Sequence, residues 1–253
     1  MKILVCGISG YMGKEVVKAA ARGLYGATLV GGIDPSYDTG LSVPVAKSFE
    51  EAALMFPKGT ADCLIDFSHH TATEALLAFA RETEIPTVVC TTGHTEGELS
   101  AIRAASSDIP VFFSANMSLG VALLVKLAKI TAAAMPDAEI EIIEKHHNRK
   151  LDAPSGTAVM LANELKTVRT DANVVCGRSG HGKREPNDIG IHAIRMGNIV
   201  GEHEVIIGTA SQTLTLKHEA HDRALFADGS LAAAAFLVNK PIGLYDMHDI
   251  VAD

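Results

Sequence analysis

The sequence predicts an α/β protein of two domains, one with a doubly wound parallel sheet and a second α+β domain built on a mixed or antiparallel sheet. In the first half of the chain, short apolar runs alternate with segments of helical periodicity, as in a parallel sheet covered by helices. In the second half, polar and apolar residues alternate within single runs, as in strands that expose one face. An aromatic content of 5% and the absence of Trp favour cores of Ala, Val, Ile and Leu.

The first domain is predicted from apolar runs that are short enough for buried strands. They cover residues 2–6, 27–33, 63–65, 87–90 and 111–113. Behind the first run, apolar residues recur at every fourth position from Met12 to Leu24, which places them on one face of a helix. Further helical stretches cover residues 73–82 and 96–105. Strands that alternate with helices in this way predict a parallel, doubly wound sheet.

The second domain is predicted to begin with a long helix over residues 121–134. Alternating or strand-like runs follow at residues 139–144, 189–195, 204–207 and 212–217. The run 176–188 is rich in glycine and charge and lacks periodicity, so it predicts a long loop of the kind that often forms a functional lid. A helix over 224–238 is expected to return the chain to the first sheet, where 244–251 would pack. We therefore expect one domain to span residues 1–117 with 228–253, and the other residues 118–227.

Composition narrows the class of protein and its partners. The net charge of −8 disfavours general nucleic-acid binding, although an acidic body can hold a local basic pocket for an anionic metabolite. The opening MKILVCGISG has too short an apolar run for a signal peptide, and no run approaches the roughly 20 residues of a membrane helix. We therefore expect a cytoplasmic protein that does not bind membranes. The cysteines stand far apart without a CxxC pair, and all but Cys176 lie in or at the ends of strand-like runs, so we expect reduced, buried thiols and no metal site.

Three glycines, Gly7, Gly10 and Gly13, lie between the first predicted strand and the first predicted helix. The usual dinucleotide pattern is GxGxxG, and here the middle glycine is displaced by one position. The physics is unchanged, because a turn without side chains lets backbone N–H groups and the positive end of the helix dipole approach a pyrophosphate. Asp34 closes the second apolar run, where a carboxylate can bind the hydroxyls of an adenosine ribose. The lysine after Gly13 is followed by Glu15 rather than Ser or Thr, which excludes a P-loop and favours a Rossmann-type domain that binds NAD(P) over one that binds ATP.

The most informative segment, residues 144–158, reads EKHHNRKLDAPSGTA. It leaves a predicted strand, places two histidines and three cationic side chains in a short loop, and offers Ser155, Gly156 and Thr157 ahead of a helical run. Free backbone N–H groups and hydroxyls at a helix start bind anions, and Lys150 with the neighbouring histidines can neutralise a second negative group. A small dicarboxylate is the natural occupant. By composition alone, the alternative is a solvated basic loop before a capped helix.

The pattern E-x-H-H-x-x-K-x-D-A-P-S-G-T-A in this segment resembles the signature of the dihydrodipicolinate reductase family. Other landmarks of that family agree over roughly residues 2–251: the glycine turn, Asp66-Phe67-Ser68, Thr91-Thr92-Gly93, residues 114–118, Arg195 with Gly197, Gly201-Glu202-His203, and Arg223 with Phe226, Ala227 and Gly229. The resemblance implies an enzyme of lysine and diaminopimelate biosynthesis. Its reaction would convert (2S,4S)-4-hydroxy-2,3,4,5-tetrahydrodipicolinate to 2,3,4,5-tetrahydrodipicolinate by hydride transfer from NAD(P)H with loss of water.

The resemblance also implies roles for individual residues. His146 would be the acid/base residue and Lys150 the proton donor, which suits a hydride addition that builds negative charge on an unsaturated imine. The substrate carboxylates would be held by His147, Ser155, Gly156 and Thr157. The cofactor would be lined by Gly7, Ile8, Ser9, Gly10, Tyr11, Met12, Asp34, Phe67, Cys90, Thr91, Thr92, Ser114, Ala115, Asn116 and Met117. The second domain would bind the substrate and join the subunits into a homotetramer.

Three departures from the family pattern concern the cofactor. His69-His70 stand where an Arg or Lys and a Pro are common, Cys90 stands where glycine is common, and Pro35 rather than Arg follows Asp34. The histidines weaken a cationic contact, and the cysteine crowds a turn. Without a cation beside it, Asp34 would repel a 2′-phosphate, so we expect NADH to serve at least as well as NADPH.

Two other classes of protein share parts of this pattern. A semialdehyde dehydrogenase has a similar two-domain layout, but it needs an activated nucleophilic cysteine, and nothing around Cys176 suggests activation. A non-catalytic NAD(P) sensor would have no reason to combine His146, Lys150 and the segment 155–157, and a catalytic assay separates it from an enzyme. The paired histidines are unsuited to a metal, because neighbouring side chains on a strand point to opposite faces and no third ligand follows at metal spacing.

Overall fold

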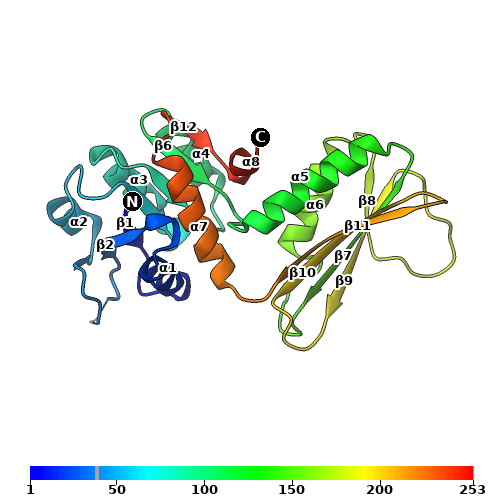
Figure 1. Ribbon diagram of the computed structural model, residues 1–253, viewed down its shortest axis with the longest axis horizontal. Coiled ribbons are helices and arrows are strands. Elements are labelled where there is room, and N and C mark those ends of the chain that lie inside the picture. The colour runs from blue at the N-terminus through cyan, green and yellow to red at the C-terminus, as the bar shows by residue number, and fades with distance from the viewer. Residues whose placement is uncertain (38–39, 253) are drawn as a thin grey trace. The chain divides into compact units, whose positions relative to one another are not determined.

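The computed structural model describes residues 1–37 and 40–252. The chain forms two compact units, Met1–Ser118 with Ala224–Asp253 and Leu119–Arg223, which we call the first and the second unit (Figure 1). Each unit has its own sheet and its own buried apolar core. The sequence prediction placed the first change of domain after residue 117 and the return at residue 228. No helix in the described ranges is long and apolar enough to cross a membrane.

Among the described residues, the sheet of the first unit has seven parallel strands in the order β12-β6-β5-β4-β1-β2-β3. Five of them confirm the predicted apolar runs: β1 (Lys2–Cys6), β2 (Thr28–Ile33), β4 (Cys63–Asp66), β5 (Thr87–Val89) and β6 (Pro110–Phe113). The outermost strands, β3 (Val45–Ala46) and β12 (Gly243–Tyr245), are too short to show a pattern in the sequence. The strands proceed outward from β1 in both directions, so the sheet is doubly wound as predicted.

Helices cover both faces of this sheet. One face carries three helices, α2 (Phe49–Met55), α3 (Thr73–Glu82) and α4 (Glu96–Ala105). The apolar core there includes Phe56, which follows α2, Leu76 of α3 and Ile102 of α4. On the other face, α1 (Tyr11–Ala21) packs against α7 (Ala224–Leu237), and α7 contacts β4, β5 and β6. Helix α7 thus lies against the first sheet, where the sequence prediction expected the chain to return. The remaining helices of this unit are α8 (Met247–Val251) and two 3₁₀ turns, η1 (Leu24–Gly26) and η2 (His70–Ala72).

The sheet of the second unit is mixed, in the order β11-β10-β7-β9-β8. Its strands are β7 (Glu139–His146), β8 (Asn173–Cys176), β9 (Asp188–Arg195), β10 (Gly201–Gly208) and β11 (Thr213–Ala220). β10 runs antiparallel to β7 and β11, whereas β7, β9 and β8 are parallel to one another. One face of the sheet packs against α5 (Leu119–Ala134) and α6 (Gly156–Lys166), with Ile142, Leu161 and Val205 in the core between them.

Strand β7 extends further than the sequence predicted. Side chains along a strand alternate between its faces, so Ile140, Ile142, Glu144 and His146 all point to the side of the helices, and all four are buried. The prediction ended this strand at Glu144 and placed His146 in the following loop, which is wrong. The alternation of buried and partly exposed side chains continues to His146, but the buried positions 144 and 146 hold a glutamate and a histidine. The strand end was misplaced because the strand had been recognised by apolar residues at its buried positions.

Cys176 also differs from the prediction. It ends β8 and is exposed, whereas we expected it to lie outside a strand and to be buried. Three of the four side chains of this strand are exposed, because β8 is the edge of the sheet, and so no apolar run marks it. Cys6, Cys63 and Cys90 are buried as expected. Residues 177–187 form neither helix nor strand, in agreement with the predicted long loop.

Candidate functional site

The glycine turn joins β1 to α1 and leaves no room for side chains at two of its positions. Gly7 has a φ of +75°, which residues other than glycine rarely adopt. A Cβ at Gly13 would lie 2.2 Å from the carbonyl oxygen of Gly7, so only glycine lets the helix begin this close to the turn. The amide of Gly10 donates to that same oxygen at 3.0 Å. The turn therefore presents the first backbone N–H groups of α1 at the carboxyl end of β1, which is the arrangement that binds a pyrophosphate.

Asp34 follows β2 and is attached to the same turn. Its carboxylate accepts hydrogen bonds from the amides of Ser9 and Ser36, both at 2.9 Å. An acidic residue at the end of the strand beside β1 binds the ribose hydroxyls in dinucleotide-binding folds. An ionised carboxylate offers about four acceptor sites, so Asp34 can accept ribose hydroxyls in addition to the two amides.

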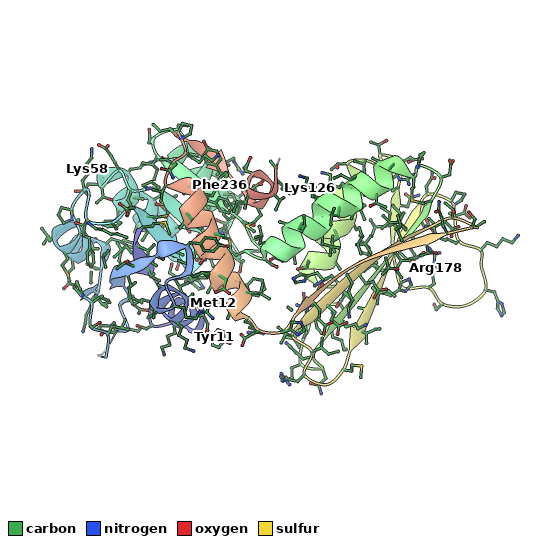
Figure 2. All side chains as sticks on the ribbon, in the orientation of Figure 1. Tyr11, Met12, Lys58, Lys126, Arg178 and Phe236 are labelled. Atoms are coloured by element: carbon green, nitrogen blue, oxygen red, sulfur yellow. The ribbon has the colours of Figure 1, made fainter. Side chains whose placement is uncertain are left out.

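A pocket of about 510 Å³ opens in the first unit at the carboxyl ends of these strands. Figure 2 labels Tyr11 and Met12, which line it from the start of α1. Eight of the predicted cofactor residues line this pocket: Tyr11, Met12, Phe67, Cys90, Thr91, Thr92, Ala115 and Met117. Three further lining residues were not among the predicted cofactor residues: Ser68, His69 and Phe226.

The other predicted cofactor residues are not among those that line the pocket: Gly7, Ile8, Ser9, Gly10, Asp34, Ser114 and Asn116. Ile8 is only 1% exposed and its side chain lies against Gly32, so it belongs to the core. The hydroxyl of Ser114 donates to the carbonyl oxygen of Asn116 at 2.9 Å, which shapes the loop after β6.

A buried carboxyl group holds two loops of this pocket together. Asp66, the last residue of β4, accepts hydrogen bonds from the hydroxyls of Ser68 at 2.5 Å and Thr91 at 2.6 Å. Burial raises the pKa of Asp66, and these hydroxyl hydrogen bonds oppose the rise. Because the contacts join the loop after β4 to the loop after β5, Asp66 positions Phe67 and Thr91 at the pocket.

In the second unit, a fully buried carboxylate collects several donors. Glu144 accepts two hydrogen bonds from Arg195, from Nη1 to Oε2 at 2.7 Å and from Nη2 to Oε1 at 2.6 Å. Nδ1 of His146 lies 2.6 Å from Oε2, and the amide of Ser155 donates to Oε1 at 2.9 Å. Burial alone would raise the pKa of Glu144, but Arg195, His146 and the Ser155 amide outweigh it and hold that pKa below its usual value. The carboxylate is therefore ionised at neutral pH.

Two histidines lie next to each other beside this carboxylate. The ring centroids of His146 and His203 are 5.2 Å apart, and the rings are nearly perpendicular. Nε2 of His203 lies 3.0 Å from the hydroxyl oxygen of Ser155. Burial and then the neighbouring His146 lower the pKa of His203 to about 4. His203 is consequently neutral at physiological pH, so it places no positive charge against His146.

The loop after β7 brings a lysine and the start of α6 to the same cluster. Arg195 Nη2 donates to the carbonyl oxygen of Asp152 at 2.6 Å, and Lys150 Nζ lies 2.8 Å from the Asp152 carboxylate. Ser155 caps α6 through its side-chain oxygen. Gly156 is exposed, and the space where a Cβ would stand on it is open. The first turn of α6 can therefore offer its N–H groups to an anion.

The structure links four of the six predicted residues of this site through Glu144 and its partners: His146 and Ser155 directly, Lys150 through Asp152 and Arg195, and Gly156 through Ser155. His147 lies just outside β7, where its amide donates to the carbonyl oxygen of Ile199 at 2.8 Å. Thr157 is the second residue of α6.

Glu144, Arg195 and His203 had no predicted role, although all three belong to the residues that carry the family resemblance. One signal was available: Glu144 stands two residues before His146, which puts both on one face of a strand.

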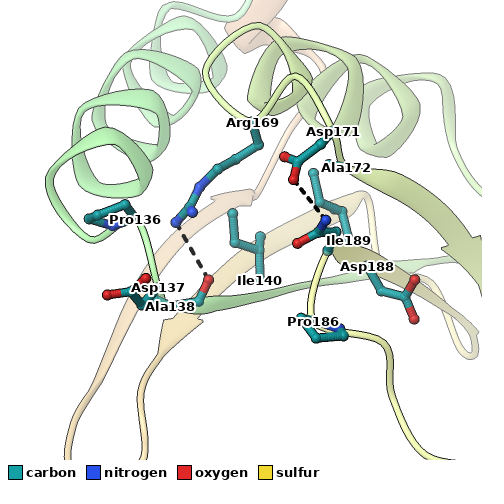
Figure 3. A pocket seen from close by; sticks show the side chains of 11 residues that line it. Pro136, Asp137, Ala138, Ile140, Arg169, Asp171, Ala172, Pro186, Asp188 and Ile189 are labelled. Carbon is teal, nitrogen blue, oxygen red and sulfur yellow. Dashed lines mark hydrogen bonds between the residues drawn. The ribbon is translucent and has the colours of Figure 1, made fainter.

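Another pocket, of about 200 Å³, lies in the second unit (Figure 3). Its lining includes residues that follow α5, residues that follow α6 and the start of β9. Arg169 donates there to the carbonyl oxygens of Met135 and Ala138, and Asn187 donates to Asp171 at 2.7 Å. These polar groups bind one another. None of the predicted site residues is among those that line this pocket.

Two solved structures with the same fold are a reductase and a dehydrogenase by name. A dipicolinate-bound dihydrodipicolinate reductase from Paenisporosarcina sp. TG-14 superimposes with a TM-score of 0.83 at 24% identity and covers 99% of both chains. An amine dehydrogenase from Mycobacterium smegmatis superimposes with a TM-score of 0.65 at 13% identity, covering 98% of this chain and 95% of its own. At these identities the likeness establishes the fold.

Sequence comparison is more specific. The family model for the N-terminus of dihydrodipicolinate reductase matches residues 1–117, and the model for its C-terminus matches residues 120–251. The 4-hydroxy-tetrahydrodipicolinate reductase of Clostridium novyi (strain NT) is 42% identical over 252 residues, which cover 99% of this chain and 98% of the relative. That of Caldanaerobacter subterraneus subsp. tengcongensis is 42% identical over 253 residues, with 99% and 98% covered.

The parallel sheet, the glycine turn and the pocket at the ends of its strands define the class of protein: an oxidoreductase that uses a nicotinamide cofactor on a Rossmann-type unit. The chain belongs to the dihydrodipicolinate reductase family. It is therefore a reductase of lysine and diaminopimelate biosynthesis, and the reaction is the one that the family name describes.

The lowered pKa of His203 predicts how stability depends on pH. The folded protein disfavours protonated His203, whereas the unfolded chain binds this proton below its ordinary pKa of about 6.5. The stabilisation is therefore present above pH 6.5 and is lost as pH falls toward 4. From pH 7 to pH 5, the free energy of unfolding of His203→Gln should fall by ~2 kcal/mol less than that of the wild type. Urea unfolding of both proteins at the two pH values measures this difference.

Exposed His181 provides the control, because His181→Gln should keep the wild-type dependence on pH. An equal loss in His203→Gln and wild type would contradict the assignment.

Proposed function

We propose that His146 and Lys150 carry the acid–base chemistry that converts (2S,4S)-4-hydroxy-2,3,4,5-tetrahydrodipicolinate to 2,3,4,5-tetrahydrodipicolinate. The observation that carries this proposal is the pairing of His146 with buried Glu144, close to the open first turn of α6. The nicotinamide cofactor, when bound, supplies the hydride. Loss of the 4-hydroxy group as water and reduction of the conjugated imine both need proton transfer. Lys150 is the proton donor and His146 the acid/base group, which together relieve negative charge on the ring.

The substrate carboxylates bind, in this proposal, to His147, Ser155, Gly156 and Thr157. Support comes from the exposed backbone of Gly156 at the start of α6, because a helix N-terminus with free N–H groups favours anions. Lys150 adds a positive charge close by. The relative from Paenisporosarcina was solved with dipicolinate, a planar dicarboxylate, which supports a dicarboxylate in this family.

The cofactor binds, in this proposal, to the glycine turn and to the pocket of the first unit. The geometry of the turn supports this, because a side chain at Gly13 would collide with the backbone of Gly7 and close the approach to the first N–H groups of α1. Asp34 binds the adenosine ribose. The loops that carry Phe67 and Thr91, held by Asp66, line the pocket beyond the turn.

The chemical roles are tested by replacing His146 and Lys150. His146→Gln and Lys150→Ala should each lower kcat at least about 100-fold, because general acid/base groups contribute roughly 10²- to 10⁴-fold. Cofactor binding should change little, since the cofactor's contacts lie in the first unit. The assay follows NADH or NADPH oxidation with the condensation product of pyruvate and aspartate semialdehyde. Thr157→Val should mainly raise KM for this substrate, and pyridine-2,6-dicarboxylate should compete with it and bind poorly to Lys150→Ala.

Lys166→Ala is the matched control, because this exposed lysine ends the same helix α6. Near-normal kcat in folded His146→Gln and Lys150→Ala would remove both residues from the mechanism.

The choice of cofactor should follow from Asp34. Its carboxylate repels a 2′-phosphate, and Pro35 supplies no compensating cation, so kcat/KM with NADH should equal or exceed that with NADPH. Asp34→Asn should raise the NADPH/NADH ratio of kcat/KM by about fivefold or more. Asp62→Asn serves as control in the same unit, because Asp62 accepts from the amide of Lys2, away from the pocket. A wild-type preference for NADPH above about tenfold would refute the electrostatic argument.

We propose that the enzyme assembles as a homotetramer through the sheet of the second unit. The face opposite α5 and α6 carries partly buried Ile143 and Ile206 beside the Lys145–Glu202–Lys217 ion pairs, and β11 is an edge strand that needs cover. Sedimentation at micromolar concentration should give about four times the chain mass of 26.6 kDa. A mass of one chain would disprove the assembly.

A further inference from the structure

We propose that Glu144 is a positioning residue that fixes the tautomer of His146, and that Arg195 holds Glu144 in the orientation this requires. The inference rests on the proposed catalytic role of His146. It extends that role to two residues of the second unit that act through His146 and that the sequence analysis left without a function.

The contact with Glu144 determines which nitrogen of His146 carries the hydrogen. Nδ1 lies 2.6 Å from Oε2 of Glu144, a hydrogen-bond distance. An ionised carboxylate can only accept, so Nδ1 must be the donor. In the neutral ring Nε2 then has a free lone pair, and in the protonated ring Nε2–H is the acid. The contact with Glu144 therefore assigns proton exchange to Nε2.

The other ring nitrogen, Nε2, lies beside a glycine. Gly201 begins β10, and a Cβ built on it would stand only 3.1 Å from Nε2 of His146. The absence of a side chain at position 201 thus keeps Nε2 clear. Nε2 therefore faces the side-chain-free position 201, whereas Nδ1 faces the buried carboxylate of Glu144.

Arg195 holds the carboxylate of Glu144 in its orientation. Each carboxylate oxygen of Glu144 has two donors: Oε2 has His146 and Arg195, and Oε1 has Ser155 and Arg195. The fork of the guanidinium sets the plane of the carboxylate, and its further bond to the carbonyl oxygen of Asp152 fixes the fork. Oε2 is consequently held toward Nδ1. Arg195 stands beside His146 in the register of β7 and β9, but its guanidinium donates to Glu144 and to the carbonyl oxygen of Asp152, so it acts on the tautomer of His146 through Glu144.

A spectrum of the wild-type protein reports the tautomer of His146 directly. The full chain is labelled with ¹⁵N-histidine, two-bond ¹H–¹⁵N correlations are recorded above pH 8, and His146 is assigned by its loss in His146→Gln. We expect Nδ1 to be protonated and Nε2 to be bare. A bare Nδ1 overturns the inference, whatever the variants do.

Glu144→Gln supplies the functional test. The oxygen of glutamine should replace Oε1, where Arg195 and Ser155 both donate, which leaves the amide NH₂ facing Nδ1. That amide donates to Nδ1 and drives the hydrogen to Nε2, the reverse tautomer. We expect kcat to fall at least about 100-fold, as general acid/base catalysis fails, while KM for the substrate and Kd for the cofactor change less than about fivefold.

Glu164→Gln is the matched control, because Glu164 is an ion-paired glutamate of the same unit, bonded to Lys129 near the C-terminal end of α6 and away from the sheet face proposed as the subunit interface. It should keep the wild-type tautomer and kcat. A fall in kcat of Glu144→Gln with an unchanged tautomer of His146 would show a merely structural role and overturn the inference. The two proposals fail separately, since normal turnover in His146→Gln rejects the proposed function, whereas the wild-type spectrum alone can reject the tautomer assignment.

Discussion

The bidentate ion pair between Glu144 and Arg195 is the interaction on which the architecture of the second unit depends. It joins β7 to β9, and through Ser155 and Asp152 it fixes the segment between β7 and α6. Burial of the Glu144 carboxylate costs several kcal/mol, and it is tolerated because each of its oxygens has two donors, whereas Arg195 remains partly exposed. Loss of Arg195 would leave the buried carboxylate without its cation, at a cost of roughly 3–5 kcal/mol. The fold of this unit and the proposed role of His146 therefore depend on the same ion pair.

The first unit meets the opposite requirement. It must leave donors and space for an anionic ligand, and it does so by the absence of side chains at Gly7 and Gly13. Its buried carboxyl, Asp66, accepts hydrogen bonds from the hydroxyls of Ser68 and Thr91, which are neutral donors, and burial raises its pKa. The two units thus use buried carboxyl groups differently. Asp66 is held by neutral donors and arranges loops, whereas Glu144 is ionised and orients His146, the proposed acid/base residue.

Much of the fold could be predicted because the central strands of the first sheet are continuous apolar runs and the helices have clear periodicity. Strands β3 and β8 could not, since a few residues at a sheet edge carry no pattern. In the site, His146, Lys150 and Ser155 stand out because their residue types cluster in one short segment. The partner of Glu144 lies 51 residues away on β9, and Phe226 reaches the cofactor pocket from α7. Only the folded sheet brings such residues together.

One face of strand β7 contributes to both the core and the candidate site, because Ile140 and Ile142 belong to the core and Glu144 and His146 to the cluster proposed as catalytic. That face repeats with a period of two, so one residue inserted or deleted between Ile142 and Glu144 would turn the charged pair to the opposite side of the sheet. Compensation would require a second change of the same kind. The loop 177–187 carries no such constraint, because it forms neither helix nor strand. Evolution can lengthen that loop one residue at a time, but it can change the length of β7 only in steps of two.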